Sequence, residues 1–267
     1  MTEQKSNLER RATDSTEHSS LRARGIYLLP NLFTSAALFS GFFAIISAMN
    51  FKYEYAAIAI FVAMVLDGLD GRVARMTNTQ SAFGAEYDSL SDMVSFGVAP
   101  ALIVYVWALK PLGKLGWIAA FIYCACAALR LARFNTKVED AFQDKRFFQG
   151  LPSPAAAALL AGFVWVSYEY GISGREIFFG AIKMQWLAWC LTVFAAGSMV
   201  SDLSFYSGKD FNLRKSVPFV AVLAIMLAFV LISYSPPEVL FAVVLVYALS
   251  GYYLWLRSKF KKTVEPD

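Results

Sequence analysis

Four aspartates lie close together in an otherwise apolar part of the sequence. The stretch AMVLDGLDGRVARMTNTQSAFGAEYDSLSDMVSFGVAP contains Asp67, Asp70, Asp88 and Asp92. A charged side chain in a membrane span costs about 2.5–3.5 kcal/mol on insertion scales, so acidic residues in such a segment are functional candidates. Four of them at these spacings predict a reaction or binding centre.

Helical periodicity gathers these aspartates on two faces. On the first helix, five residues lie within about 140° of one face at 100° per residue. These five are Asp67, Asp70, Gly71, Ala74 and Arg75. On the next helix, the i, i+4 rule places Gly84, Asp88 and Asp92 on one face. Two neighbouring helices can therefore direct two carboxylates each into one shared space.

Four carboxylates in one space need a cation. Without one they repel, and most of them take up protons. Ligand sets made only of oxygen suit hard divalent ions such as Mg²⁺, Mn²⁺ or Ca²⁺. The only histidine of the chain, His18, lies in the N-terminal tail, and no cysteine accompanies the cluster. A divalent oxygen-bound ion is therefore expected, rather than zinc or haem.

Three neighbouring residues indicate what such an ion would hold. Gly71 and Gly84 have no side chain, so a ligand can approach the backbone closely. Arg75 adds a fixed positive charge that can pair with a phosphate. Together with the acidic ligands, these residues suit a pyrophosphate substrate. Two alternatives stay open at this point: a structural pairing of a buried aspartate with an arginine, and an ion site in a cation-coupled transporter.

The rest of the sequence predicts a membrane protein. Of its 267 residues, 58% are hydrophobic and 16% are charged, whereas soluble domains carry about 25% charged residues. The apolar residues form runs long enough to cross about 30 Å of hydrocarbon as helices. We expect an all-α, polytopic bundle of about eight transmembrane helices, preceded by a polar tail over residues 1–26. The expected helices are 31–49, 53–76, 89–109, 115–134, 153–168, 185–206, 216–234 and 238–256.

Basic residues predict the orientation of this bundle. If both termini are cytoplasmic, all but five of the 24 lysines and arginines fall on the cytoplasmic side. Such an excess is typical of cytoplasmic loops and supports an even number of helices. The aspartates then lie at the cytoplasmic edge of the membrane.

The aspartate segment resembles the signature of the CDP-alcohol phosphotransferase family, D-x-x-D-G-x-x-A-R-x8-G-x-x-x-D-x-x-x-D. Every fixed position matches, from Asp67 to Asp92. Three further stretches resemble the serine-accepting bacterial branch of that family: LPNLFT (29–34), LRLARFN (129–135) and GLPSPAAA (150–157). With MVSDLSFYSGKDF (199–211), where Asp202 and Gly208 depart from the pattern, the similarity reaches from about residue 27 to 215.

This resemblance implies a role for each matched residue. One or two divalent ions, Mn²⁺ or Mg²⁺ with Ca²⁺ as a substitute, would be held by Asp67, Asp70, Asp88 and Asp92. Asp92 would also be the general base. The CDP-diacylglycerol site would be lined by Asn31, Thr34, Asp67, Gly71, Arg75 and Gly84.

The acceptor site is predicted from chemistry as well. A free amino acid carries a carboxylate, whose burial requires a cation. Arg130 and Arg133 are candidates for that cation, with Asn135 and Ser153 as polar partners. A role as positive-inside anchors is the alternative for each arginine. Glycerol 3-phosphate or an inositol phosphate would need cations too, so these residues alone do not select serine.

The resemblance further implies the reaction and its setting. The phosphatidyl group of CDP-diacylglycerol would pass to L-serine with release of CMP, by direct displacement because no covalent nucleophile is evident. A six-helix catalytic core would occupy residues 27–215, and residues 216–267 would add two helices and a basic tail. The expected partners are CDP-diacylglycerol, L-serine, membrane lipid and a second copy of the chain, but no nucleic acid. The expected location is the plasma (inner) membrane of a bacterium.

Overall fold

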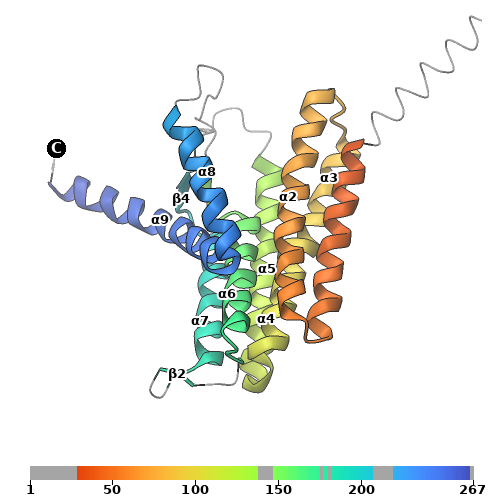
Figure 1. Ribbon diagram of the computed structural model, residues 1–267. Helices are drawn as coiled ribbons and strands as arrows, with labels where there is room; N and C mark the ends of the chain where they lie inside the picture. The colour runs from red at the N-terminus through yellow and green to blue at the C-terminus, as the bar shows by residue number, and fades with distance from the viewer. Residues whose placement is uncertain (1–28, 138–146, 175–176, 180–181, 207–218, 265–267) are drawn as a thin grey trace, which may run out of the picture.

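The structure, a computed structural model, describes residues 29–137, 147–174, 177–179, 182–206 and 219–264. Eight helical rods dominate these residues (Figure 1). The first is the N-terminal helix Leu29–Met49. The others are α2 (Tyr53–Thr77), the continuous rod from α3 (Ala82–Asp92) to Leu112, α5 (Lys114–Lys137), α6 (Ser153–Glu169), α7 (Met184–Val200), α8 (Phe219–Tyr234) and α9 (Pro236–Val264). The predicted all-α bundle is confirmed. The predicted tail over residues 1–26 lies outside the described residues.

The third rod contains wide helical turns that a proline explains. It runs through a π-helical segment, η1 (Met93–Val98), then α4 (Ala99–Val104), a second π-helical segment, η2 (Tyr105–Leu109), and a 3-10 turn, η3 (Lys110–Leu112). Pro100 has no N–H to donate to the Phe96 carbonyl one turn earlier. The Tyr123 hydroxyl of α5 donates to that carbonyl instead, at 3.0 Å. The break in the helix is thus compensated by a neighbouring helix, as apolar surroundings require.

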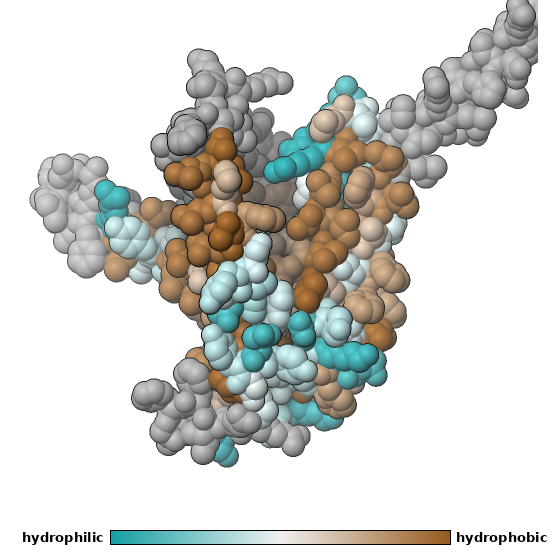
Figure 2. All heavy atoms as spheres, in the orientation of Figure 1, coloured by the Kyte–Doolittle hydropathy of each residue, from teal (hydrophilic) through white to brown (hydrophobic). Residues whose placement is uncertain are grey.

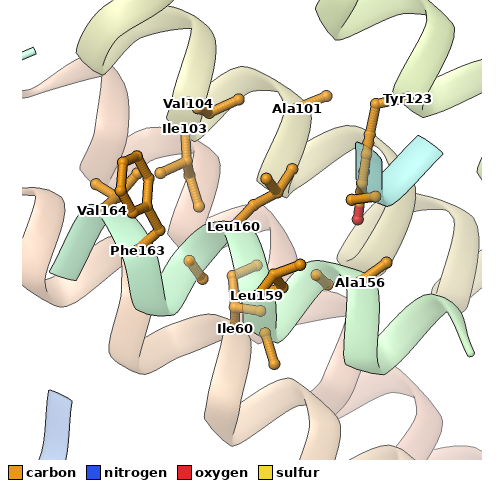
Figure 3. Close-up of a cluster of buried hydrophobic side chains, with 14 of the residues drawn as sticks. Ile60, Ala101, Ile103, Val104, Tyr123, Ala156, Leu159, Leu160, Phe163 and Val164 are labelled. Atoms are coloured by element: carbon orange, nitrogen blue, oxygen red, sulfur yellow. The ribbon is translucent and has the colours of Figure 1, made fainter. Parts of the chain in front are cut away.

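Helix α6 forms the centre of the bundle. Most of its residues are buried, and it packs against both α2 and α9. Leu159 and Leu160 of α6 lie among Ile60 of α2 and Ile103 of α4 (Figure 3). Small residues such as Ala156 let these helices approach closely, which is how helices commonly associate in membranes.

Hydroxyl groups join the N-terminal helix to the third rod. Ser91 and Ser95 donate to backbone carbonyls of the N-terminal helix, at 3.1 and 3.2 Å. A side chain at Gly41 would clash with Ser95, so the two backbones meet closely there. These contacts fix the N-terminal helix beside the aspartate-bearing part of α3.

Three predicted helix bounds are wrong by six residues or more. The last helix, α9, continues to Val264 rather than ending at residue 256. The third rod begins at Ala82 rather than at residue 89, because Ser81 caps it by accepting from the Gly84 N–H. The sixth helix ends at Val200 rather than at residue 206. Residues Ser204–Tyr206 form strand β4, which pairs antiparallel with β1 (Phe147–Gln149). Pairing with a strand far away in sequence thus replaces the end of the predicted helix.

A second pair of short strands lies at the opposite end of the bundle. Its strands, β2 (Ile177–Phe179) and β3 (Ile182–Lys183), precede α7. Hydrophobic residues cover the visible faces of α8 and α2 (Figure 2). Among the described residues, four helices are long and apolar enough to cross a membrane: Leu29–Met49, Ala82–Leu112, Lys114–Thr136 and Pro236–Arg257.

Candidate active site

The predicted site residues come from elements that meet at one end of the bundle. The C-terminal part of α2, the start of α3, the end of α5, the start of α6 and β4 all lie there (Figure 1). The chain reverses direction between successive helices, so segments more than 100 residues apart in sequence become neighbours. Strands β2 and β3 lie at the other end and take no part.

Three aspartates form one compact cluster. Asp67, Asp70 and Asp88 each offer a carboxylate oxygen, and these oxygens all lie within 4.8 Å of one another. Asp70 is buried, with 5% of its surface exposed, and the other two are half-buried. The structure therefore brings together carboxylates from α2 and α3, as the helical spacing predicts.

Asp92 borders this cluster on the side of α5. Its carboxyl group lies within hydrogen-bonding range of Asp67 and within electrostatic range of Asp88. The Arg130 guanidinium also lies within electrostatic range of Asp92. Asp92 is therefore near both the three-aspartate cluster and Arg130.

The cluster has the features of a cation site. Asp88 Oδ1 is buried and has no hydrogen-bond partner among the residues that the structure describes. Within the described part of the chain, no lysine or arginine forms an ion pair with any of the four aspartates. A buried, unpaired carboxylate oxygen is costly, and oxygen ligands of this kind suit a hard divalent ion. The residues present therefore fit a divalent metal, although they do not by themselves choose among Mg²⁺, Mn²⁺ and Ca²⁺.

Thr34 orients one of the ligands. Its hydroxyl donates to Asp70 Oδ2 at 2.7 Å, and both groups are buried. The same hydroxyl lies 3.2 Å from the Pro30 carbonyl. Ser91 holds the Thr34 backbone from α3. Thr34 was predicted near the nucleotide, and in the structure it contacts the aspartate cluster through Asp70.

The predicted CDP-diacylglycerol residues lie near the aspartates, and one of them, Gly71, has open space beside it. A side chain at Gly71 would meet no atom within 4 Å, so the helix surface is accessible there. Arg75 Nε donates to the Gly71 carbonyl at 2.9 Å, which places the guanidinium beside this turn of α2. At Gly84, an added side chain would approach Asn31 Oδ1 at 3.4 Å. Asn31 and Gly84 are therefore neighbours, although they are far apart in sequence.

The predicted acceptor residues separate into two groups. Arg130 donates to Ser153 Oγ at 2.7 Å, and Ser153 is fully buried at the start of α6. Arg133 instead pairs with Asp202 at 2.6 Å and donates to Gln149 at 3.2 Å. Through these contacts, Arg133 of α5 joins β1 to the end of α7.

Asn135 takes a third position. Its side-chain amide donates to Ser89 Oγ at 2.9 Å, so it lies against α3 beside Asp88. Two contributors were not predicted from sequence. Asp202 stood out only as a departure from the family pattern, and Tyr247 of α9 lies in electrostatic range of Arg130. No local signal distinguishes Tyr247 from the other aromatic residues of that helix.

Comparison with known proteins decides the family. A profile of the CDP-alcohol phosphatidyltransferase family matches residues 27–196. The chain belongs to the CDP-alcohol phosphatidyltransferase family. All four aspartates, Arg130 and Ser153 lie inside the matched residues, whereas β4, α8 and α9 lie outside them. Members of this family use divalent metals, in agreement with the cluster, and the apolar helices make the chain an integral membrane protein.

Curated relatives of this family share one name. The chain is 34% identical over 234 residues to a CDP-diacylglycerol–serine O-phosphatidyltransferase of Helicobacter pylori, covering 86% of this chain and 92% of the relative. A protein of the same name from Methanocaldococcus jannaschii is 34% identical over 201 residues, covering 74% and 83%. Another, from Saccharomyces cerevisiae, is 37% identical over 163 residues, covering 57% and 58%.

Proposed function

We propose that the protein transfers the phosphatidyl group of CDP-diacylglycerol to L-serine, giving phosphatidylserine and CMP. The observation that carries this proposal is the Asp67, Asp70 and Asp88 cluster beside Asp92, in a chain whose curated relatives bear the name of this activity. The cluster suits a diphosphate held by divalent metal, and the space around Gly71 gives the substrate access to it.

The metal would be held by Asp67, Asp70 and Asp88, with Asp92 at its edge. We propose Mn²⁺ or Mg²⁺, as one or two ions. When bound, such ions draw negative charge from a diphosphate and stabilise the departing phosphate oxygen. Asn31 and Gly84 flank the same end of α3, and Arg75 adds positive charge beside Gly71 for the diphosphate or nucleotide.

Asp92 is the proposed general base. The serine hydroxyl is a poor nucleophile at neutral pH, so a carboxylate must accept its proton as the oxygen attacks. The new bond joins that oxygen to the lipid-bearing phosphorus. The bond from this phosphorus to the bridging oxygen breaks, and the oxygen leaves with CMP. Asp92 suits this task because it is near both the metal ligands and the proposed acceptor-binding Arg130.

Arg130 and Ser153 are the proposed acceptor-binding pair. The acceptor carboxylate needs a cation in a partly buried site. Arg130 Nε is buried and makes no hydrogen bond within the described residues, so it has a donor to offer. Arg133 is held by Asp202 and Gln149, and we therefore propose a structural role for it. Asn135 stays a candidate polar contact on the α3 side.

The proposed setting follows from charge. We propose that both termini and the site face the cytoplasm in a bacterial inner membrane, because the basic residues collect on that side. We propose a homodimer as the working assembly, on the resemblance to the family alone. Crosslinking of the protein in native membranes tests this assembly independently of activity.

A direct assay tests the reaction. Purified protein in detergent is incubated with CDP-diacylglycerol, Mn²⁺ and labelled L-serine, and both CMP and labelled lipid are measured. We expect equal amounts of the two products, and none of either after chelation of the metal. CMP release with glycerol 3-phosphate or an inositol phosphate, but not with serine, would keep the chemistry and refute the acceptor. Formation of labelled lipid without release of CMP would refute the proposal altogether.

A further inference from the structure

A short turn leads into the proposed acceptor site. It runs from Gln149, the last residue of β1, to Ser153, the first residue of α6. Ser153 is fully buried and accepts a hydrogen bond from Arg130 at 2.7 Å. The position of this turn therefore sets where the Ser153 hydroxyl meets the Arg130 guanidinium.

Two arginines of α5 hold the two ends of this turn. Arg130 binds Ser153 at one end. Arg133, one helical turn further along α5, donates from Nη2 to Gln149 Oε1 at 3.2 Å at the other end. The same nitrogen donates to Asp202 Oδ1 at 2.6 Å. Asp202 thus binds the arginine that holds the beginning of the turn.

The segment that carries Asp202 also supports this turn through its backbone. It connects the end of α7 to β4. The Gly150 N–H donates to the Leu203 carbonyl at 2.8 Å, and the Leu151 N–H donates to the Ser198 carbonyl at 2.9 Å. Gly150 has a positive φ of 76°, and an added side chain there would clash with the backbone of this segment. The two segments are therefore in close contact, and Asp202 lies in sequence between the two residues that accept.

The ion pair between Asp202 and Arg133 matters for geometry rather than for stability. The Asp202 side chain is 83% exposed, and an exposed ion pair adds little to the free energy of unfolding. An arginine side chain has many rotamers, however, and a fixed carboxylate restricts them. The rotamer that reaches Asp202 is the one that also reaches Gln149. Without the carboxylate, the guanidinium would sample other positions and hold the turn less firmly.

We infer that Asp202 is a positioning residue for the acceptor site, acting through Arg133 and the turn that carries Ser153. This inference rests on the proposed function, because it concerns the same acceptor site. Asp202 and β4 lie outside residues 27–196, which the family profile matches. The geometry of acceptor binding thus depends in part on a residue beyond the matched segment.

The variant Asp202→Ala tests the inference, with Glu86→Ala as its matched control. Glu86 is an exposed acidic residue near the start of α3, at the same end of the bundle, so its loss changes the net charge equally. We expect Asp202→Ala to raise the KM for serine about three- to fivefold, the upper range for an exposed ion pair of good geometry. The KM for CDP-diacylglycerol, kcat and the thermal midpoint in detergent should not change. Asp202→Glu should restore much of the affinity for serine, and Glu86→Ala should leave all four quantities unchanged.

A double variant shows whether Asp202 acts through Arg133. If it does, Arg133→Gln should raise the KM for serine at least as much as Asp202→Ala. Adding Asp202→Ala to Arg133→Gln should then have no further effect, because the interaction is already lost. A double variant in which the two effects multiply would refute the action through Arg133, and with it the inference.

The outcomes separate this inference from the proposed function. Wild-type protein is measured first, and an absence of turnover with serine, glycerol 3-phosphate and inositol phosphate would refute both. Turnover with another of these alcohols but not with serine would refute the proposed acceptor, and the variants are then measured with that alcohol. With an active wild type, an unchanged acceptor KM in Asp202→Ala refutes the inference alone. An equal rise in the KM for both substrates also refutes it, because a general loosening of the fold would act on both.

Discussion

The hydrogen bond from Thr34 to Asp70 makes a specific prediction about metal affinity. In Thr34→Val the side chain keeps its shape and loses the hydroxyl that lies 2.7 Å from Asp70 Oδ2. A hydrogen bond to a charged group contributes about 1.5–3 kcal/mol. At about 1.4 kcal/mol per factor of ten, the metal concentration for half-maximal activity should rise about ten- to a hundredfold. Residues that support metal ligands typically have effects of this size.

The assay is the initial rate of CMP release as a function of Mn²⁺, with both substrates saturating. Thr34→Ser is the control, because serine retains a hydroxyl at the same position and should keep near-normal metal dependence. An unchanged half-saturating Mn²⁺ concentration in Thr34→Val would refute the reasoning. A raised KM for CDP-diacylglycerol with normal metal dependence would instead assign Thr34 to the nucleotide, as the family resemblance first implies.

Three further predictions concern catalysis and stability. Asp92→Asn should lower turnover about 10²- to 10⁴-fold, the usual contribution of a general base, while binding of CDP-diacylglycerol, measured by titration, stays near normal. Asp88→Asn should weaken both turnover and binding of CDP-diacylglycerol. Near-normal turnover of the Asp92 variant would refute its role as base. Gly150→Ala should lower the thermal midpoint much more than Gly171→Ala. Both glycines have positive φ, at 76° and 67°, but only at Gly150 would an added side chain clash with backbone atoms. Equal shifts of the thermal midpoint would contradict this. Tyr123→Phe should lower the free energy of unfolding by about 1–3 kcal/mol, since it leaves a buried carbonyl without its donor, and an unchanged thermal midpoint would show that the carbonyl is satisfied otherwise.

Much of the aspartate site could be predicted from sequence because its spacing is local. Asp67 and Asp70 lie one turn apart on α2, and Asp88 and Asp92 lie one turn apart on α3. Helical geometry alone then fixes which side chains share a face. The short connection between the two helices leaves them as neighbours, so the meeting of the carboxylates follows almost directly.

The predicted helix bounds are wrong where tertiary contacts compete with the local preference for helix. The helix predicted after Met184 extends to residue 206, although Ser201, Asp202 and Ser204 interrupt its apolar character. The backbone N–H of Leu151 donates to the Ser198 carbonyl at 2.9 Å. Residues Ser204–Tyr206 then pair with β1. No pattern within the predicted helix indicates that its last residues pair with a strand some 55 residues earlier.

The two arginines of LRLARFN show the same division between sequence and structure. Both carry the same charge and lie one turn apart, so the sequence treats them alike. In the folded chain Asp202 pairs with Arg133, whereas Arg130 points to Ser153 and lies near Asp92. Only the tertiary structure distinguishes a structural arginine from one with a donor to offer.

The sequence by itself determined the membrane bundle, the paired aspartate faces and the family, because each depends on composition or on spacing within one or two helices. The tertiary structure alone decided which hydroxyl supports Asp70, which arginine stays available and which one Asp202 holds in place. Those features depend on distances between residues far apart along the chain, and such distances are set by helix packing and strand pairing rather than by any local pattern.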